Sequence, residues 1–166
     1  ESLVRQGITT IVAGQDGSSR GGARPEAGGQ RPEGAFAALL AGIEANKPAV
    51  NVASMIGLGS VRGRVVGNDD RPATPDELRT MVAMVESALA EGACGASSGL
   101  EYTPGAFAST EELIALCRPL ASRGLPYATH MRNEDDRLLE SIDESIAVAR
   151  GAELVGRLGD VAGGEP

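Results

Sequence analysis

The sequence predicts an α/β fold made of parallel βα units. Two observations lead to this prediction: short runs of β-branched and small residues are bounded by glycine, and these runs alternate with helical patterns. Parallel strands need a crossover connection, which a helix supplies, so the alternation favours a parallel sheet. A doubly wound sheet and part of a (β/α)8 TIM-type barrel both fit. Because a whole barrel needs about 250 residues, a chain of 166 residues could form only part of one.

The four predicted strands cover residues 7–14, 49–57, 92–99 and 125–131. The first two consist of β-branched and small residues, which is typical of strands buried on both faces. The other two are less hydrophobic, but each follows a helical pattern and precedes polar loop residues. We expect the strands to lie parallel and in sequential order, with the helices on the outer face, because right-handed crossovers make successive strands neighbours.

Two of the predicted helices have clear start signals. Thr74, Pro75 and Glu77 form a capping box with proline at the first helical position, and Gly92 ends the helix that they begin. Ser109 begins a second helix with the same device. Two further helices are predicted over residues 35–45 and 134–150.

Composition excludes several classes of partner. The net charge is -8 and aromatic residues make up 2% of the chain. Nucleic-acid binding needs clustered basic residues and aromatic rings for base stacking, so neither nucleic acid nor an anionic membrane is expected as a partner. No apolar run approaches the roughly 20 residues of a membrane span, and the first residues lack the order of a signal peptide, so a cytoplasmic protein is expected. Cys94 and Cys117 lack metal-knuckle spacing and are expected to be buried free thiols.

Two glycine-rich segments are not expected to bind a ligand. Residues 57–63 resemble a dinucleotide fingerprint, but the third glycine is displaced by one position and no helix clearly begins there, so no nucleotide site is predicted. Residues 18–34 are rich in Gly, Pro and Arg without any periodicity. They are expected to form a flexible surface loop.

Asp16 and His130 are the candidate metal ligands. Each follows or ends a predicted strand, and in α/β folds reactive groups gather at the carboxyl ends of parallel strands. A carboxylate oxygen and an imidazole nitrogen are an ordinary pair of zinc ligands. The alternatives are that Asp16 caps a strand-to-loop turn and that His130, the sole histidine, is a structural residue.

Four blocks of sequence, in order between residues 8 and 150, resemble the N-acyl-D-amino-acid deacylases, or D-aminoacylases, of the amidohydrolase superfamily. They are "GITTIVAGQDG", "NVASMIGLGSVR", the long block that contains "SSGLEYTPGA", and "YATHMRNEDDRLLESIDESIAVAR". The resemblance implies a zinc-dependent barrel, with a small β domain outside it, that hydrolyses the amide bond of N-acyl-D-amino acids. The chain would form a single partial barrel domain over residues 1–166, with about strands 2 to 5 of the barrel.

The resemblance also implies roles for individual residues. Asp16 occupies the position of the metal ligand that follows the second barrel strand, and His130 matches the ligand that ends the fifth strand. Tyr102 matches a tyrosine that lines the substrate site, and Arg132, within "THMR", is a second candidate substrate-binding residue. Glu134 lies in the same motif without an assigned role.

Several residues of the family pattern have no counterpart in the chain. The His-x-His pair of the first strand, the histidine of the sixth strand and the catalytic aspartate are missing, so the catalytic base is unknown. We therefore expect a fragment that is inactive by itself, although its family-level activity is hydrolysis of an N-acyl amino acid. The alternative is a non-catalytic half-barrel that acts as an assembly or interaction module, with homo-oligomers forming through exposed strand edges.

Overall fold

The structure is a computed structural model that describes residues 2–19 and 34–154. Most of the segment predicted to be a flexible loop, residues 18–34, lies outside the described residues, so that interpretation stays a prediction. Within the described part, strands and helices alternate along the chain, as the sequence predicts.

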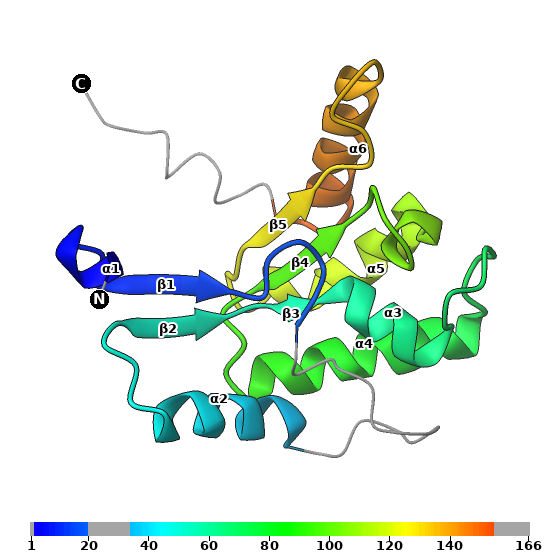
Figure 1. Ribbon diagram of the computed structural model, residues 1–166. Helices are drawn as coiled ribbons and strands as arrows, with labels where there is room; N and C mark the ends of the chain where they lie inside the picture. The colour runs from blue at the N-terminus through cyan, green and yellow to red at the C-terminus, as the bar shows by residue number, and fades with distance from the viewer. Residues whose placement is uncertain (1, 20–33, 155–166) are drawn as a thin grey trace.

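The strands are parallel throughout (Figure 1). They are β1 (Thr10–Ala13), β2 (Asn51–Ser54), β3 (Ile56–Gly57), β4 (Ala96–Gly99) and β5 (Tyr127–His130). β1 pairs with β2, and the second group has the order β3-β4-β5. The predicted parallel α/β arrangement with sequential strand neighbours is confirmed within each group. The described residues form no closed barrel, and their membership of a barrel stays a prediction.

The single strand predicted over residues 49–57 is observed as two strands that meet at Met55. The Met55 N–H donates to the Ala13 carbonyl on the β1 side, whereas the Ile56 N–H donates to the Gly95 carbonyl next to β4. The chain therefore exchanges one hydrogen-bonding neighbour for the other at this point. This exchange, and not a turn, divides the strand.

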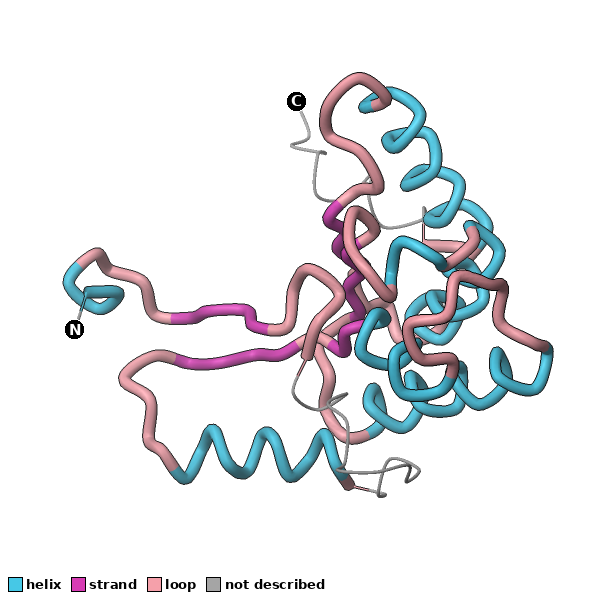
Figure 2. Tube along the Cα trace, turned by 45° about the vertical axis from the view of Figure 1, so that its right-hand side comes forward, coloured by secondary structure: helices cyan, strands magenta, loops and turns pink. Residues whose placement is uncertain are grey.

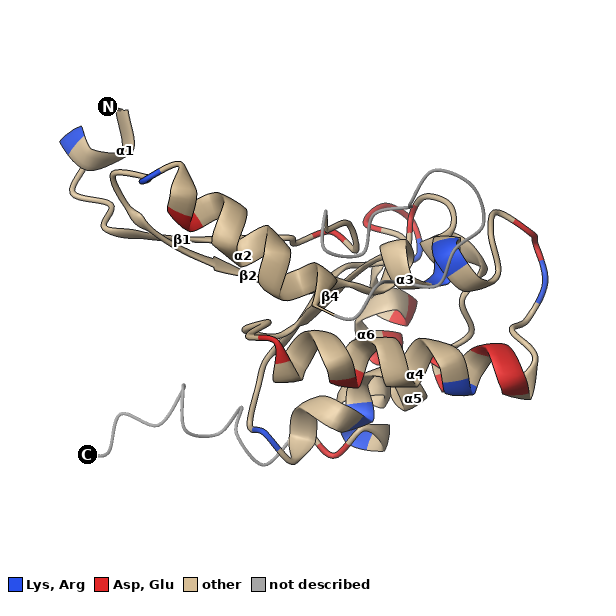
Figure 3. Ribbon diagram, turned by 90° about the horizontal axis from the view of Figure 1, so that it is seen from below, with Lys and Arg blue, Asp and Glu red and all other residues tan. Residues whose placement is uncertain are grey.

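Helices cover the sheet mainly on one side. The helical elements are α1 (Ser2–Arg5), α2 (Ala35–Ala45), α3 (Leu58–Val65), α4 (Pro75–Ala90), the 3-10 turn η2 (Gly105–Phe107), α5 (Thr110–Ala121) and α6 (Leu138–Gly151). α3, α4, α5 and α6 pack on one another in sequence order. β1 and β2 extend away from this group (Figure 2), and α2 lies beneath them (Figures 1 and 3).

Two helix predictions are corrected. The prediction that no helix begins in residues 57–63 is wrong, because α3 starts at Leu58 and buries Leu58 and Val61 almost completely. Its glycines are poor helix formers, so this packing stabilises a helix that propensity alone does not predict. α6 begins at Leu138 and not at residue 134, since the Asn133 side chain accepts hydrogen bonds from the backbone N–H groups of Asp135 and Arg137 and forms a turn there.

The core lies between the sheet and the α4 and α5 helices. Each of these two helices turns an apolar face toward the core, and the fully enclosed residues of these faces are Met81, Val85, Ala88, Leu113, Leu116, Cys117 and Leu120. Cys94 and Cys117 are free thiols, as predicted, but only Cys117 is buried and Cys94 is partly exposed. Burial raises the pKa of the Cys117 thiol to about 12. None of the helices within residues 2–19 and 34–154 is long and apolar enough to cross a membrane.

The N-terminus of α4 has the predicted capping box. The Thr74 hydroxyl accepts from the Glu77 N–H at 3.3 Å, and the Glu77 carboxylate accepts from the Thr74 N–H at 2.8 Å. At α5 only half of the device forms: Ser109 accepts from the Glu112 N–H at 3.2 Å, while the Glu112 side chain turns to Arg62. The second capping box is therefore replaced by a tertiary contact.

Replacing Glu77 by glutamine is expected to destabilise the protein at neutral pH and to have less effect in acid. The Glu77 carboxylate accepts two hydrogen bonds of 2.8 Å from Arg71, and these, together with the Thr74 N–H, lower the pKa of Glu77 to about 2. A lowered pKa in the folded state contributes stability above the unfolded pKa of about 4.3, and this contribution disappears as the pH falls through the folded value.

Urea unfolding of both proteins between neutral pH and about pH 2 measures this effect. The difference in unfolding free energy between wild type and Glu77→Gln should shrink over the acid part of the range. Glu86→Gln, at an exposed position of α4, is the matched control and should unfold like the wild type at neutral pH. A difference for Glu77→Gln that does not change with pH would contradict the prediction.

Candidate functional site

The candidate site lies at the carboxyl ends of β1, β4 and β5. Asp16 follows β1, Glu101 and Tyr102 follow β4, and His130 is the last residue of β5. Parallel strands bring their carboxyl ends to one edge of the sheet, so side chains far apart in sequence meet there. The Leu100 N–H also donates to the His130 carbonyl at 3.0 Å, which holds the ends of β4 and β5 together.

Asp16 and His130 face each other across this edge. Asp16 Oδ1 lies 3.9 Å from His130 Nδ1, although the two residues come from strands that are not hydrogen-bonded to each other. Asp16 has a φ of 58°, a left-handed conformation that aspartate tolerates better than most residues. The structure therefore brings the two predicted ligands together, and their role as ligands stays a prediction.

A buried serine fixes the loop that carries Asp16. The Ser97 hydroxyl, on β4, donates to the Gly14 carbonyl at 2.6 Å and accepts from the Gly17 N–H at 3.1 Å. Ser97 is fully buried, so both bonds are shielded from water. These bonds fix the backbone on both sides of Asp16 to β4, a strand of the other group.

Glu101 is the nearest charged group to the other nitrogen of His130. Glu101 Oε2 lies 2.9 Å from His130 Nε2, and Glu134 Oε1 lies 3.9 Å from the same nitrogen. The hydrogen bond to Glu101 is the main cause that raises the pKa of His130; the negative charges of Glu134, Glu101 and Asp16 add to it, and burial opposes it. His130 is thus surrounded by three carboxylates.

Tyr102 contacts both Asp16 and His130. Its hydroxyl donates to the Asp16 carbonyl at 2.7 Å, and its ring packs edge-on against the His130 ring with 5.5 Å between centroids. Burial raises the pKa of Tyr102, and the charges of Asp16 and Glu101 raise it further. A side chain at Gly99 would collide with the Tyr102 hydroxyl and the Asp16 carbonyl, so this close packing requires glycine there.

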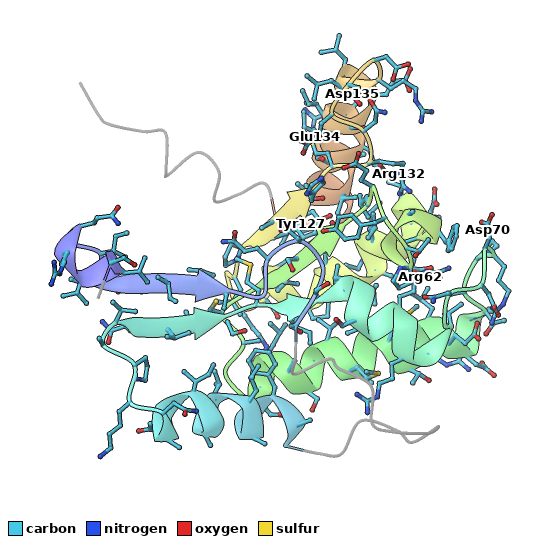
Figure 4. The ribbon with its side chains drawn as sticks, viewed as in Figure 1. Arg62, Asp70, Tyr127, Arg132, Glu134 and Asp135 are labelled. Carbon is cyan, nitrogen blue, oxygen red and sulfur yellow. The ribbon has the colours of Figure 1, made fainter. Side chains whose placement is uncertain are left out.

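Arg132 is held by structural contacts. Its guanidinium donates to Glu144 through Nε and Nη2 at 2.9 and 3.0 Å. It also donates to the Ala106 and Ala108 carbonyls at 2.6 and 2.8 Å. Figure 4 shows Arg132 beyond the tip of β5, close to α6. These bonds tie α6 to the segment that precedes α5, and a substrate-binding role for Arg132 stays a prediction.

An open cavity of about 260 Å³ lies beside Asp16 and Tyr102. Glycines and Pro104 make up about half of the remaining lining, and its other side chains are polar: Ser18, Ser60, Arg64, Asn68 and Thr103. Arg64 supplies the cationic group, and the hydroxyls and the amide supply neutral donors. The cavity therefore presents a cationic side chain, Arg64, and an anionic one, Asp16, to a small molecule.

The donor set fits part of a zinc site. Catalytic zinc usually takes about three protein ligands and keeps one position for water. Asp16 and His130 supply an oxygen and a nitrogen, and within residues 2–19 and 34–154 no group of three or more His, Cys, Asp or Glu residues could hold a metal. A complete zinc site would therefore need at least one donor from elsewhere.

Sequence reasoning missed Glu101 as a site residue. Its position carried a signal, because it comes two residues after the end of a buried strand and directly before Tyr102 in "GLEY". The hydroxyls in the preceding "SSG" were a second signal, since polar residues inside a fully buried strand need specific partners.

Comparison with known proteins identifies similar sequences and structures. No protein-family model matches the chain. The D-aminoacylase of Alcaligenes xylosoxydans xylosoxydans is 38% identical over 157 residues, which cover 89% of this chain and 32% of that protein. This chain thus spans about a third of the length of such relatives.

Solved structures of D-aminoacylases and related deacylases are also similar to this chain. A D-aminoacylase structure concerned with the functional role of its binuclear metal centre is 36% identical and has a TM-score of 0.79, with 91% of this chain and 34% of that chain covered. An N-acyl-D-glutamate deacylase from Bordetella bronchiseptica, complexed with zinc and a phosphonate that mimics the tetrahedral intermediate, is 34% identical. Its TM-score is 0.81, and the match covers 90% of this chain and 34% of that chain.

Proposed function

We propose that this chain, a homologue of the D-aminoacylases and N-acyl-D-amino-acid deacylases, forms part of the active site of a zinc-dependent hydrolase of N-acyl-D-amino acids. These relatives are amidohydrolases, and the chain spans about a third of their length. The observation that carries the proposal is the 3.9 Å approach of Asp16 Oδ1 to His130 Nδ1 at the carboxyl edge of the parallel strands.

Asp16 and His130 would be the two ligands that this chain contributes to the zinc. When bound, zinc would supply an acidic water, with a pKa of about 7, and a Lewis acid for the amide carbonyl. Ser97 and Tyr102 hold the Asp16 loop in place through the Gly14, Gly17 and Asp16 backbone groups. The family's catalytic aspartate has no counterpart in the sequence pattern of this chain, so the group that would accept the proton stays unassigned.

The cavity beside these ligands would receive the substrate. An N-acyl-D-amino acid carries a carboxylate, and Arg64 is the guanidinium that lines the cavity, with Ser60 and Thr103 as neutral donors. The Tyr102 hydroxyl donates its proton to the Asp16 carbonyl, so its oxygen lone pairs are what it offers a substrate N–H group. Arg64 lines the cavity and Arg132 does not, so we favour Arg64 as the residue that receives the substrate carboxylate.

A chimera tests the proposed function. The matched third of the D-aminoacylase is replaced by this chain, and zinc content and hydrolysis of N-acetyl-D-amino acids are measured for the chimera and for the 166-residue chain. Two ligands are too few for tight zinc binding, so the isolated chain should lose its zinc on dialysis and show no turnover. The chimera should retain zinc and be active, because the flanking segments supply the remaining ligands and the general base.

Substitutions in the chimera assign the ligands. His130→Ala and Asp16→Asn should each abolish turnover and lower the zinc content. Asp143→Asn, at an exposed position of α6, is the matched control for Asp16→Asn and should leave both unchanged. A chimera that stays active after His130→Ala would contradict the ligand assignment, and turnover by the isolated chain would contradict the incomplete site.

A second candidate function, an assembly module, is favoured by one observation. The α6 helix exposes an apolar stripe in which Leu139 is 77% exposed and Ile146 is 42% exposed. Such a stripe needs a covering partner, which is either the rest of a barrel or another chain. A chimera that folds and binds zinc but has no activity would favour the assembly role.

A further inference from the structure

The two ring nitrogens of His130 face different carboxylates. Nε2 lies 2.9 Å from Glu101 Oε2, which is a hydrogen-bonding distance, whereas Nδ1 lies 3.9 Å from Asp16 Oδ1, which is too long for a direct hydrogen bond. The third carboxylate, Glu134, lies 3.9 Å from Nε2. Glu101 is therefore the only one of the three that bonds the ring directly.

An ionised carboxylate only accepts hydrogen bonds, so Nε2 must carry the proton in the contact with Glu101. In a neutral imidazole the other nitrogen then has a lone pair, and this lone pair lies on the Asp16 side of the ring. The hydrogen bond made by one ring nitrogen decides which nitrogen can bind a metal.

The surroundings of Glu101 restrict its position and that of the ring. The preceding residue, Leu100, donates its N–H to the His130 carbonyl at 3.0 Å, so the backbone beside Glu101 is fixed to the end of β5. The following residue, Tyr102, packs against the His130 ring and donates to the Asp16 carbonyl. Residues 100 to 102 thus contact both candidate ligands.

We propose that Glu101 is a positioning residue that holds His130 with Nε2–H toward Glu101 and presents Nδ1 to a metal bound together with Asp16. This inference rests on the proposed function for the identity of the metal site. To that function it adds which nitrogen of His130 binds the metal and which residue, Glu101, selects that nitrogen.

Nitrogen NMR of the chain labelled with 15N-histidine tests the positioning without metal or activity. His130 is the sole histidine of the chain, so every imidazole signal belongs to it. At a pH above the His130 pKa, the shifts of the two ring nitrogens should show the proton on Nε2. In Glu101→Ala the averaged shifts should move toward the tautomer mixture of a free imidazole. Glu101→Gln keeps an acceptor oxygen and should stay close to the wild type.

Glu134→Ala is the matched control, because it removes a neighbouring carboxylate that is not hydrogen-bonded to the ring. It should leave the tautomer unchanged. A wild-type protein with the proton on Nδ1, or equal effects of Glu101→Ala and Glu134→Ala, would overturn the proposal, since the latter would show a general charge effect.

Addition of zinc to the labelled chain identifies the binding nitrogen. In excess zinc, Nδ1 should shift and Nε2 should keep its proton. In the chimera, Glu101→Ala should weaken zinc binding by about 10- to 100-fold, the usual effect of losing a histidine-orienting carboxylate. A primary shift at Nε2 would overturn the proposal and make Glu101 and Glu134 co-ligands.

The outcome is separable from that of the proposed function. An inactive chimera in which His130 still carries its proton on Nε2 contradicts the function and leaves the positioning intact. An active chimera with the proton on Nδ1 contradicts the positioning alone.

Discussion

Replacing Glu112 by alanine is expected to lower the free energy of unfolding by about 3–5 kcal/mol, because it leaves a buried guanidinium without its counter-charge. Glu112 on α5 pairs with Arg62 on α3 at 3.1 Å between Oε1 and Nε, and the two side chains are only 4% and 1% exposed. Arg62 also donates to the Arg71 and Phe107 carbonyls at 2.6 and 3.3 Å. The pair thus joins α3, α5 and the segments that precede α4 and α5.

The ionic character of the Arg62–Glu112 pair does not by itself make the pair stabilising. Burial raises the pKa of Glu112 and outweighs the opposing effect of Arg62, so taking this carboxylate out of water costs free energy. A raised pKa means that stability from this group falls as the pH rises above the unfolded value of about 4.3. The large loss expected for Glu112→Ala therefore reflects the unpaired Arg62 charge that remains.

Chemical denaturation of single and double variants measures the coupling between Arg62 and Glu112. Arg62→Met with Glu112→Leu removes both charges, and the double variant should lose less stability than the sum of the two single changes. Arg79→Ala is the surface control: it breaks the contact with Asp76, whose side chain is 84% exposed, and should change stability by about 0–1 kcal/mol. Additive single effects in the double variant would contradict the coupling.

Leu116→Ala is expected to lower the free energy of unfolding by about 2–5 kcal/mol. Leu116 lies on α5, is 1% exposed and belongs to the core between the helices and the sheet. Its removal takes apolar surface out of the core and leaves a cavity that the surrounding side chains fill only in part. The loss should appear as a lower denaturation midpoint with an unchanged slope.

Leu139→Ala is the matched control for this change. Leu139 also lies on a helix, α6, but is 77% exposed, so the same substitution should change stability by about 0.5 kcal/mol or less. Similar losses of stability in the two variants would contradict the burial of Leu116, or would show that a partner covers Leu139 in solution.

The local features of the fold could be predicted from the sequence because they depend on neighbouring residues. The α4 capping box needs Thr74 and Glu77 three residues apart, and its hydrogen bonds form within one turn. The buried stripes of α4 and α5 follow from helical periodicity. The strand-end positions of Asp16 and His130 followed from the alternation of strands and helices, since parallel strands bring their carboxyl ends to one edge.

Contacts between segments distant in sequence determined the remaining features of the fold and of the candidate site. The sequence determined that parallel βα units form and that Asp16 and His130 lie at one edge. The tertiary structure decided that the second strand changes partners at Met55, that packing of Leu58 and Val61 makes α3 helical, and that Glu144 binds Arg132. It also decided that Glu101 bonds the ring of His130, 29 residues away. Periodicity and capping patterns report the hydrogen bonds and exposure of one segment, whereas these contacts depend on which side chains of other segments lie opposite after folding.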